Sequence, residues 1–160
     1  PDVLTAETDS DFAGCGRTRK STSGYVASLG KHCIVTKTRH QSVIALSSGE
    51  AEFYAATSAI ARSIGIQQML RDWGIEVSIS LGMDATAGIT MITRQGLGKA
   101  KHINVQYLWA QEALTPNRIT LHKVKGTRNR ADMFTKYLAR AVIESLQTRL
   151  GYNWGPKPGN

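Results

Sequence analysis

The sequence lacks the features that mark secreted, membrane-spanning and disordered chains. It has two cysteines, Cys15 and Cys33, without a metal-type spacing, so we expect free thiols in a reducing compartment. It contains no signal peptide, no heptad repeat and no apolar run of about 18 residues, which predicts a protein that is neither secreted nor membrane-bound. A hydrophobic fraction of 41% sets it apart from disordered chains.

Acidic residues are also scarce. Twelve Asp and Glu stand against 20 Lys and Arg, a formal net charge of +8, which favours a polyanionic partner or surface. At 160 residues we expect a single domain over 1–150, followed by a flexible Gly- and Pro-rich tail at 151–160. The chain starts at Pro1, as a fragment of a longer protein would.

Hydrophobic periodicity predicts an α/β domain. Strands are expected over 3–11, 25–30 and 32–38, the last two forming a hairpin at Gly30-Lys31. A helix over 47–73 with Gly74 at its C-terminal cap, a strand over 77–84 and a short helix over 85–93 follow. The remaining elements are a helix over 102–114, a strand over 118–124 and a helix over 129–150. This order predicts a mixed sheet flanked by helices.

Four of the scarce acids fall at the ends of these elements. Metal-dependent chemistry on phosphodiesters needs clustered carboxylates, because Mg²⁺ prefers hard oxygen ligands and two ions about 3.5–4 Å apart stabilise both reacting oxygens. The candidates are Asp9, Glu52, Asp84 and Asp132.

Each candidate also has a purely structural interpretation. Asp9 shares its predicted strand face with Asp11, and "TDSD" is equally typical of a turn in which Asp bonds its own backbone. Asp84 could be a simple helix N-cap. Asn129 and Asp132 have the spacing of a cap followed by an acid in the first helical turn.

The stretch "LSSGEAEFYA" holds two acids with different expected roles. Residues 50 and 52 point about 200° apart on a helix, so they cannot share a face. Ser47 and Glu50 fit a capping box, which gives Glu50 a sufficient structural role. Glu52 lies past the cap beside small residues that leave room near its carboxylate, although a solvated helix glutamate is the commoner case.

Several motifs together resemble one family. "TDSDFAG", "TRKSTSGYV", "ALSSGEAEFYA", "AKHINVQYLWAQE" and "NRADMFTK", in this order from Thr8 to about Arg140, are similar to the ribonuclease H domain of copia-type retrotransposon polyproteins. The resemblance implies a ribonuclease H-like fold with a five-stranded mixed sheet, order 3-2-1-4-5. It also implies a site that binds two Mg²⁺ ions, with Mn²⁺ as a substitute, through Asp9, Glu52, Asp84 and Asp132.

The implied activity is hydrolysis of the RNA strand of RNA/DNA hybrids, giving 5′-phosphate and 3′-hydroxyl ends. The implied partners are the hybrid and an adjacent reverse transcriptase domain, in a retrotransposon particle or elsewhere in the cytoplasm. The alternatives are a catalytically weak binding or tether domain beside a reverse transcriptase, and a DNA-cutting nuclease of the wider superfamily. The complete acid set disfavours the first alternative, and the copia-specific segments disfavour the second.

The sequence departs from the family pattern in three places. "VKGTRNRAD" has Thr127 where cellular ribonucleases H carry a loop histidine that assists product release, so turnover is expected to be slower unless Arg128 partly substitutes. Ala85 follows Asp84 where relatives have a polar residue, which weakens support for the ligand. The basic handle helix of some cellular enzymes is missing.

Substrate contacts are therefore expected from loops. Basic residues near the predicted acids favour binding of phosphate backbones, although a solvated basic surface is the simpler interpretation. Small polar groups near the first strand and first helix are the candidates for reading the 2′-hydroxyl. The complete set of expected substrate contacts is Ser10, Ser48, Gly49, Arg17, Arg19, Lys20, Lys101 and Arg128.

Overall fold

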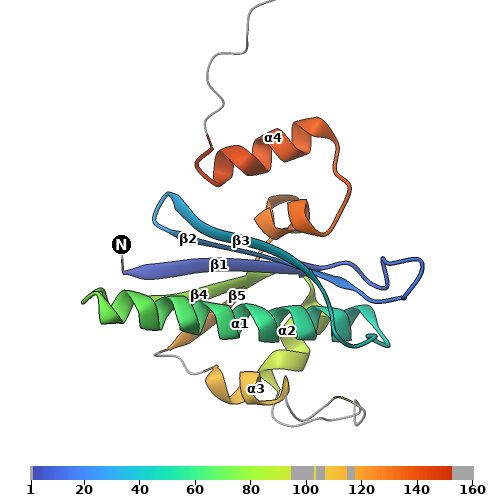
Figure 1. Ribbon diagram of the computed structural model, residues 1–160, viewed down its shortest axis with the longest axis horizontal. Helices are drawn as coiled ribbons and strands as arrows, with labels where there is room; N and C mark the ends of the chain where they lie inside the picture. Colours follow the sequence, from blue (N-terminus) through green and yellow to red (C-terminus); the bar gives the residue numbers. More distant parts are fainter. Residues whose placement is uncertain (1, 95–102, 104–106, 115–117, 153–160) are drawn as a thin grey trace, which may run out of the picture.

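A computed structural model of the chain contains a five-stranded mixed sheet with helical segments on both faces (Figure 1). The structure describes residues 2–94, 103, 107–114 and 118–152. The strands are β1 (Val3–Ser10), β2 (Thr22–Leu29), β3 (His32–His40), β4 (Ser78–Met83) and β5 (Ile119–Lys123). Their spatial order is β3-β2-β1-β4-β5, which confirms the predicted order.

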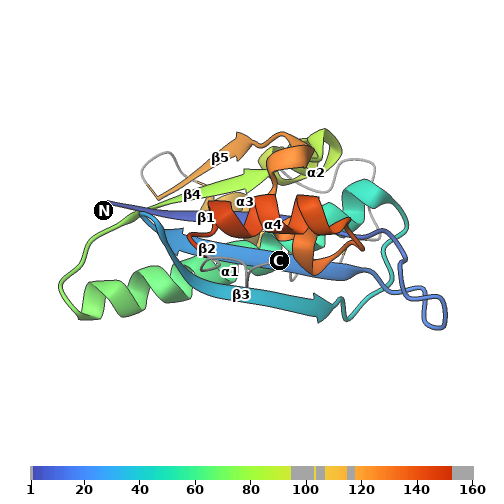
Figure 2. The same cartoon turned by 90° about the horizontal axis from the view of Figure 1, so that it is seen from above.

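The central strand β1 has neighbours of both orientations. It runs antiparallel to β2 and parallel to β4, and β5 extends the sheet parallel to β4. The long helix α1 (Ser48–Asp72), with α2 (Thr86–Thr93) and α3 (Trp109–Ala113), covers one face. The 3₁₀ turn η3 (Arg130–Phe134) and α4 (Arg140–Arg149) lie on the other (Figure 1). Since β1 and β4 are parallel, both end at the same edge of the sheet, to which the start of α1 also comes (Figure 2).

The ends of α1 follow the predicted signals. Ser47 is the N-cap and its side chain accepts a hydrogen bond from the Glu50 amide, 3.2 Å away. At the other end Gly74 has φ +79°, the left-handed conformation that a glycine after a helix adopts most easily. Between them, a face rich in alanine and carrying Phe53 and Ile60 packs on the sheet against Leu4 and Ile79. The small side chains let the helix approach closely.

Other sequence predictions are met in part. Gly30, φ +60°, turns the β2–β3 hairpin where expected, and both cysteines are free thiols. The helix predicted over 102–114 falls partly outside the described residues, and only Trp109–Ala113 of its described part is α-helical. Within the described part of the chain, no helix is both long and apolar enough to cross a membrane.

The helix predicted over 129–150 is wrong as a single element. The structure has η3, then a non-helical link over 135–139, then α4. Thr135 leaves helical geometry with φ −129°, and its hydroxyl donates a hydrogen bond to the carboxylate of Asp9. The requirement of a buried carboxylate on a distant strand thus overrides local helix propensity here.

A buried ion pair connects η3 to the central strand β1. The Arg130 Nε lies 3.0 Å from Glu7 Oε1, and its backbone amide donates to the other oxygen of Glu7 at 2.6 Å. The neighbouring Asn129 donates through Nδ2 to the Thr8 carbonyl at 3.0 Å. These contacts hold the segment that carries Asp132 against β1.

Removing Arg130 should therefore cost much stability. We expect Arg130→Ala to lower the free energy of unfolding by about 3–5 kcal/mol, because Glu7 would stay buried without its partner. Urea denaturation measures this loss. Arg140→Ala is the matched control: it breaks an ion pair with Glu144 in which the Arg140 side chain is 86% exposed, and should cost less than about 1 kcal/mol. Equal losses in the two variants would contradict a structural role for the buried pair.

Candidate active site

Three of the four predicted acids converge where β1, β4 and α1 meet. Asp9 is near the end of β1, Asp84 directly follows β4, and Glu52 lies in the first turns of α1. One carboxylate oxygen from each lies within 4.8 Å of the others. The parallel pairing of β1 with β4 brings the two aspartates to one edge, and the capped start of α1 adds the glutamate.

Glu52 faces this cluster and is almost fully buried. Its Oε1 accepts a hydrogen bond from the Ser10 amide at 3.1 Å, whereas Oε2 has no hydrogen-bond partner among the described residues. The helix α2 passes close behind it: a methyl group added at Gly88 would lie 2.6 Å from the Glu52 Cβ. A buried carboxylate oxygen without a partner is costly, unless a ligand satisfies it.

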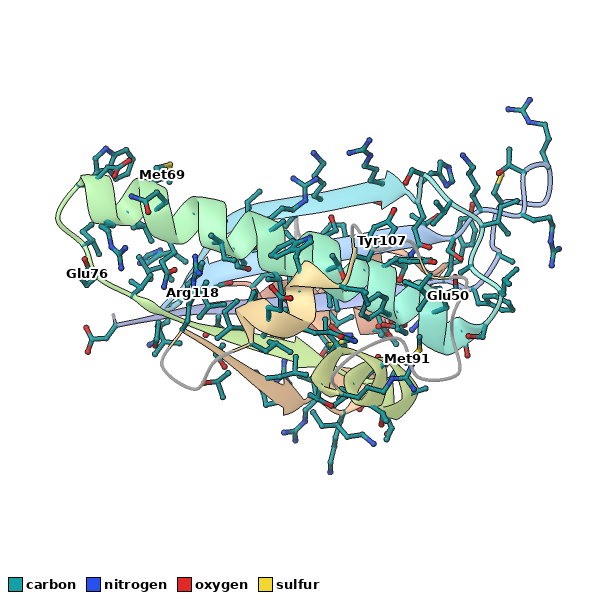
Figure 3. All side chains as sticks on the ribbon, turned by 90° about the horizontal axis from the view of Figure 1, so that it is seen from below. Glu50, Met69, Glu76, Met91, Tyr107 and Arg118 are labelled. Atoms are coloured by element: carbon teal, nitrogen blue, oxygen red, sulfur yellow. The ribbon has the colours of Figure 1, made fainter. Side chains whose placement is uncertain are left out.

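Glu50, in contrast, has the predicted structural role. Its Oε2 accepts a hydrogen bond from the Leu46 amide at 3.0 Å, one residue before the position of an ideal capping box, and Tyr54 donates to Oε1. Figure 3 shows Glu50 at the start of α1, in the same part of the molecule as Met91 of α2. The two acids of "GEAE" therefore differ as predicted: Glu50 closes the cap and Glu52 enters the cluster.

Asp132 joins the site through a lysine. Lys136 Nζ lies 3.1 Å from Asp9 Oδ1 and 3.2 Å from Asp132 Oδ1, so one ammonium bridges two carboxylates. The second oxygen of Asp9 accepts a hydrogen bond from Thr135. Asp9, 1% exposed, is thus held from both sides by the link that follows η3.

The structure supports a structural role for Asp11 and Asn129 but not the capping role considered for Asp84. Ala85, not Asp84, is the N-cap of α2, so capping does not account for Asp84. Asp11 does have a structural role, since its Oδ1 accepts a hydrogen bond from the Thr22 amide. Asn129 caps η3 by accepting from the Ala131 amide at 3.1 Å, with Asp132 as the acid in the first turn.

Burial and mutual repulsion raise the pKa values of the acids. Burial, and then the nearby charge of Asp9, raise the pKa of Glu52 to about 8. The same two causes raise the pKa of Asp132 to about 6. Burial also raises the pKa of Asp9, although Thr135 and Lys136 oppose it. The site thus holds more carboxylates than the Lys136 ammonium can neutralise.

The donor set fits a hard divalent cation. Asp9, Glu52 and Asp84 offer carboxylate oxygens, the ligands that Mg²⁺ and Mn²⁺ prefer, and the partnerless Oε2 of Glu52 is directly available to an ion.

The small residues predicted to contact RNA lie beside the acids. The Ser10 hydroxyl is buried and has no hydrogen-bond partner among the described residues. Ser48 is exposed in the first turn of α1, next to Gly49. A methyl group added at Gly49 would lie 3.0 Å from the Ala87 Cβ, so this glycine lets α1 start against α2.

The predicted basic contacts occupy two loops at this end of the sheet. Arg17, Arg19 and Lys20 lie between β1 and β2, in a loop closed by the bonds Arg19 N to Cys15 O and Cys15 N to Lys20 O (Figure 1). Arg128 ends η2 (Gly126–Arg128), whose first residue adjoins Asp84. Lys101 lies outside the described residues.

Sequence reasoning missed three residues that shape the site: Thr135, Lys136 and Gly88. The first two lie in the stretch predicted to be helical, where their contacts with Asp9 could not be anticipated. A signal for Lys136 did exist, because it follows Asp132 by four residues. Gly88 gave a weaker one, as a glycine inside a short helix often has a packing reason.

The pKa of Glu52 predicts how metal-free stability depends on pH. The folded protein holds this proton up to about pH 8, while the unfolded chain releases it near 4.5, so stability should fall as pH rises between these values. The slope approaches about 1.4 kcal/mol per pH unit. Glu52→Gln should flatten this dependence and stabilise the metal-free protein at pH 8 by on the order of 1–3 kcal/mol.

Urea unfolding in EDTA at several pH values between 5 and 8 measures this effect. Glu76→Gln, which changes an acid whose side chain is 69% exposed, is the control and should leave the slope as in the unmodified protein. A wild-type slope in Glu52→Gln would show that Glu52 does not titrate as its surroundings indicate.

Sequence comparison finds relatives among transposon polyproteins. The retrovirus-related Pol polyprotein from transposon TNT 1-94 of Nicotiana tabacum is 29% identical over 151 residues, 93% of this chain and 11% of the polyprotein. That from transposon RE2 of Arabidopsis thaliana is 26% identical over 92% of this chain and 10% of its own length. The chain thus spans about a tenth of these relatives. No family model matches it.

Structure comparison finds ribonucleases H. LC11-RNase H1, isolated from compost, superposes with a TM-score of 0.63 at 14% identity, covering 92% of this chain and 99% of that one. A structure of LC11-RNase H1 with an RNA/DNA hybrid gives a TM-score of 0.54 at 15% identity, covering 82% and 92%. At these identities the likeness shows the fold. The chain thus has a ribonuclease H-like fold, and its sequence is similar to a segment of retrovirus-related Pol polyproteins from transposons, as its motifs predicted.

Proposed function

We propose that the domain hydrolyses the RNA strand of RNA/DNA hybrids with two divalent ions, leaving 5′-phosphate and 3′-hydroxyl ends. Mg²⁺ is the proposed ion, and Mn²⁺ the proposed substitute. The observation that carries the proposal is the meeting of Asp9, Glu52 and Asp84 within 4.8 Å, in a fold shared with a ribonuclease H that has been seen bound to a hybrid.

The acids divide into two sets around Asp9. Asp9, Glu52 and Asp84 would hold one ion, and Asp9 with Asp132 the other, so all four are proposed catalytic residues. Bound divalent ions supply the positive charge that stabilises the attacking and departing oxygens of a phosphodiester. The protein holds the ligands in place: Ser10 fixes one oxygen of Glu52, and Asn129 and Arg130 fix the turn that carries Asp132.

The surrounding charge suits a nucleic acid. The loop that carries Arg17, Arg19 and Lys20 follows β1, the strand that holds Asp9, and the η2 turn that ends at Arg128 adjoins Asp84 through Gly126. We propose that these side chains contact phosphates on the two strands, an electrostatic contribution that falls with salt. Lys101 remains a proposed contact on the sequence pattern alone.

Recognition of RNA over DNA needs a group that contacts the 2′-hydroxyl. We assign this contact to Ser10, whose buried hydroxyl lacks a partner among the described residues, to the exposed Ser48 in the first turn of α1, and to the buried Gly49 that follows it. These positions adjoin Glu52, next to the bond to be cut.

The length of the relatives suggests the setting. The chain matches about a tenth of each Pol polyprotein, so we propose that the domain acts beside a reverse transcriptase in such a polyprotein, inside the cell. The domain boundary proposed from the sequence, 1–150, covers every element described.

Cleavage of an end-labelled hybrid tests the proposal. We expect the RNA strand to be cut in Mg²⁺ and not in EDTA, and Asp84→Asn to lower kcat/KM by more than about 100-fold, which corresponds to about 2.7 kcal/mol of transition-state stabilisation. Asp11→Asn is the matched control, because asparagine keeps the acceptor for the Thr22 amide and should leave cleavage unchanged.

Other outcomes select the alternatives. Hybrid binding without cleavage in either Mg²⁺ or Mn²⁺ would indicate a binding or tether domain. Cutting of duplex DNA in preference to the hybrid would indicate a DNA nuclease of the same superfamily. RNA products that lack a 5′-phosphate would contradict the proposed chemistry.

A further inference from the structure

Lys136 contacts both acids that are proposed to hold the second divalent ion. Its ammonium is 3.1 Å from Asp9 Oδ1 and 3.2 Å from Asp132 Oδ1, and these are the two acids proposed to hold that ion. No other Lys or Arg among the described residues forms an ion pair with any acid of the site.

The backbone places the lysine there. The Lys136 amide donates to the Asp132 carbonyl at 3.0 Å, which keeps the two residues one turn apart although helical structure ends at Phe134. The adjacent Thr135 hydroxyl bonds the other oxygen of Asp9. Consecutive side chains thus bind both oxygens of one buried carboxylate.

The lysine is held at one end and open to solvent. Its side chain is 40% exposed, whereas that of Asp9 is 1% exposed and that of Asp132 is 13% exposed. The Arg130 side chain in the buried pair with Glu7 is only 10% exposed. Lys136 can therefore leave its partners by rotation of a flexible four-carbon stem, without unfolding η3.

An ammonium and a divalent ion cannot occupy this position together. They would share the same carboxylate oxygens, and Mg²⁺ binds oxygen at about 2.0–2.1 Å, well inside the contact distance of an ammonium. Their like charges also repel at such a separation. The metal-free and doubly loaded forms thus need different positions of Lys136.

We propose that Lys136 is a built-in counter-ion that occupies the position between Asp9 and Asp132, and that a second divalent ion must displace it. The inference rests on the proposed function for the identity of the two metal positions. It has a direct consequence: the first ion, bound by Asp9, Glu52 and Asp84, binds more tightly than the second, because only the second removes the ammonium from both of its partners. Lys136 thereby sets the ion concentration at which the site becomes fully loaded.

Mn²⁺ binding to the metal-free domain tests this without any nuclease assay. Titration followed by the electron paramagnetic resonance signal of free Mn²⁺ gives the stoichiometry and both dissociation constants. We expect Lys136→Met, which keeps an unbranched stem in place of the four-carbon stem and removes the ammonium, to tighten the second step by at least about tenfold, or about 1.4 kcal/mol. The melting temperature of this variant in EDTA should fall, and Mn²⁺ should raise it by more than in wild type.

Lys123→Met is the matched control. Lys123 lies at the same end of the sheet, but its ammonium donates to Thr86 Oγ1 at 2.6 Å instead of to a carboxylate. It should change the second dissociation constant by less than about threefold, since only a screened, longer-range charge is lost. Lys136→Arg keeps the charge and should retain the weak second step.

The outcomes are distinct. An unchanged second step in Lys136→Met, or equal shifts in the two methionine variants, would overturn the inference and leave the proposed nuclease intact. If wild type bound no Mn²⁺ at all, the proposed function would fail with it. If Lys136→Met did not fold in EDTA, Lys136→Gln would be titrated in its place. Addition of Mn²⁺ to the unfolded Lys136→Met variant would then be informative: folding would support the inference, and failure to fold would overturn it.

Discussion

A carboxylate buried at the end of the central strand is the constraint on which the rest of the site depends. Asp9 is 1% exposed, and burying a charge is costly unless it is paired and hydrogen-bonded. Thr135 and Lys136 provide that compensation. Both lie in the non-helical link that follows η3. The shape of the C-terminal segment is therefore a consequence of a charge on β1.

Two charged side chains of β1 contact this segment, and they alternate with core positions of the strand. Glu7 and Asp9 are two apart, so they share one face of the sheet, and both contact the segment around η3: Glu7 through Arg130, Asp9 through the link that follows. Glu7 is fully paired and anchors the segment, whereas Asp9 is paired by a lysine that remains open to solvent. One strand face thus combines a buried ion pair with a partly exposed one, two residues apart.

Local rules predicted much of this site, and their limits are physical. The capping geometry of Ser47 and Glu50 could be predicted from four residues, and it left Glu52 without a structural role. In the structure, Glu52 Oε2 has no hydrogen-bond partner among the described residues. The predicted strand ends identified Asp9 and Asp84 as candidates. The two residues come together in the structure because β1 and β4 are parallel neighbours and end at the same edge of the sheet. The break before α4 was not predicted, since helix propensity continues through 135–139. The break coincides with a contact between Lys136 and a strand more than a hundred residues earlier, which local patterns do not show. Contacts of that range depend on the assembled fold.

The same shortage of positive charge links folding to metal binding. Four acids meet at one end of the sheet, and among the described residues Lys136 is the one cation that forms ion pairs with any of them. Burial first, and repulsion from Asp9 second, raise the pKa values of Glu52 and Asp132, and Glu52 Oε2 has no hydrogen-bond partner among the same residues. Protons, the Lys136 ammonium and divalent ions are three ways to supply the missing charge, and they compete for the same oxygens. A site fully neutralised by its own side chains would be more stable but would have no use for metal. A site with no internal cation would leave Asp9 buried as a bare charge. The observed arrangement lies between these limits, because Lys136, the one cation that pairs with these acids among the described residues, contacts two of them while its side chain stays 40% exposed.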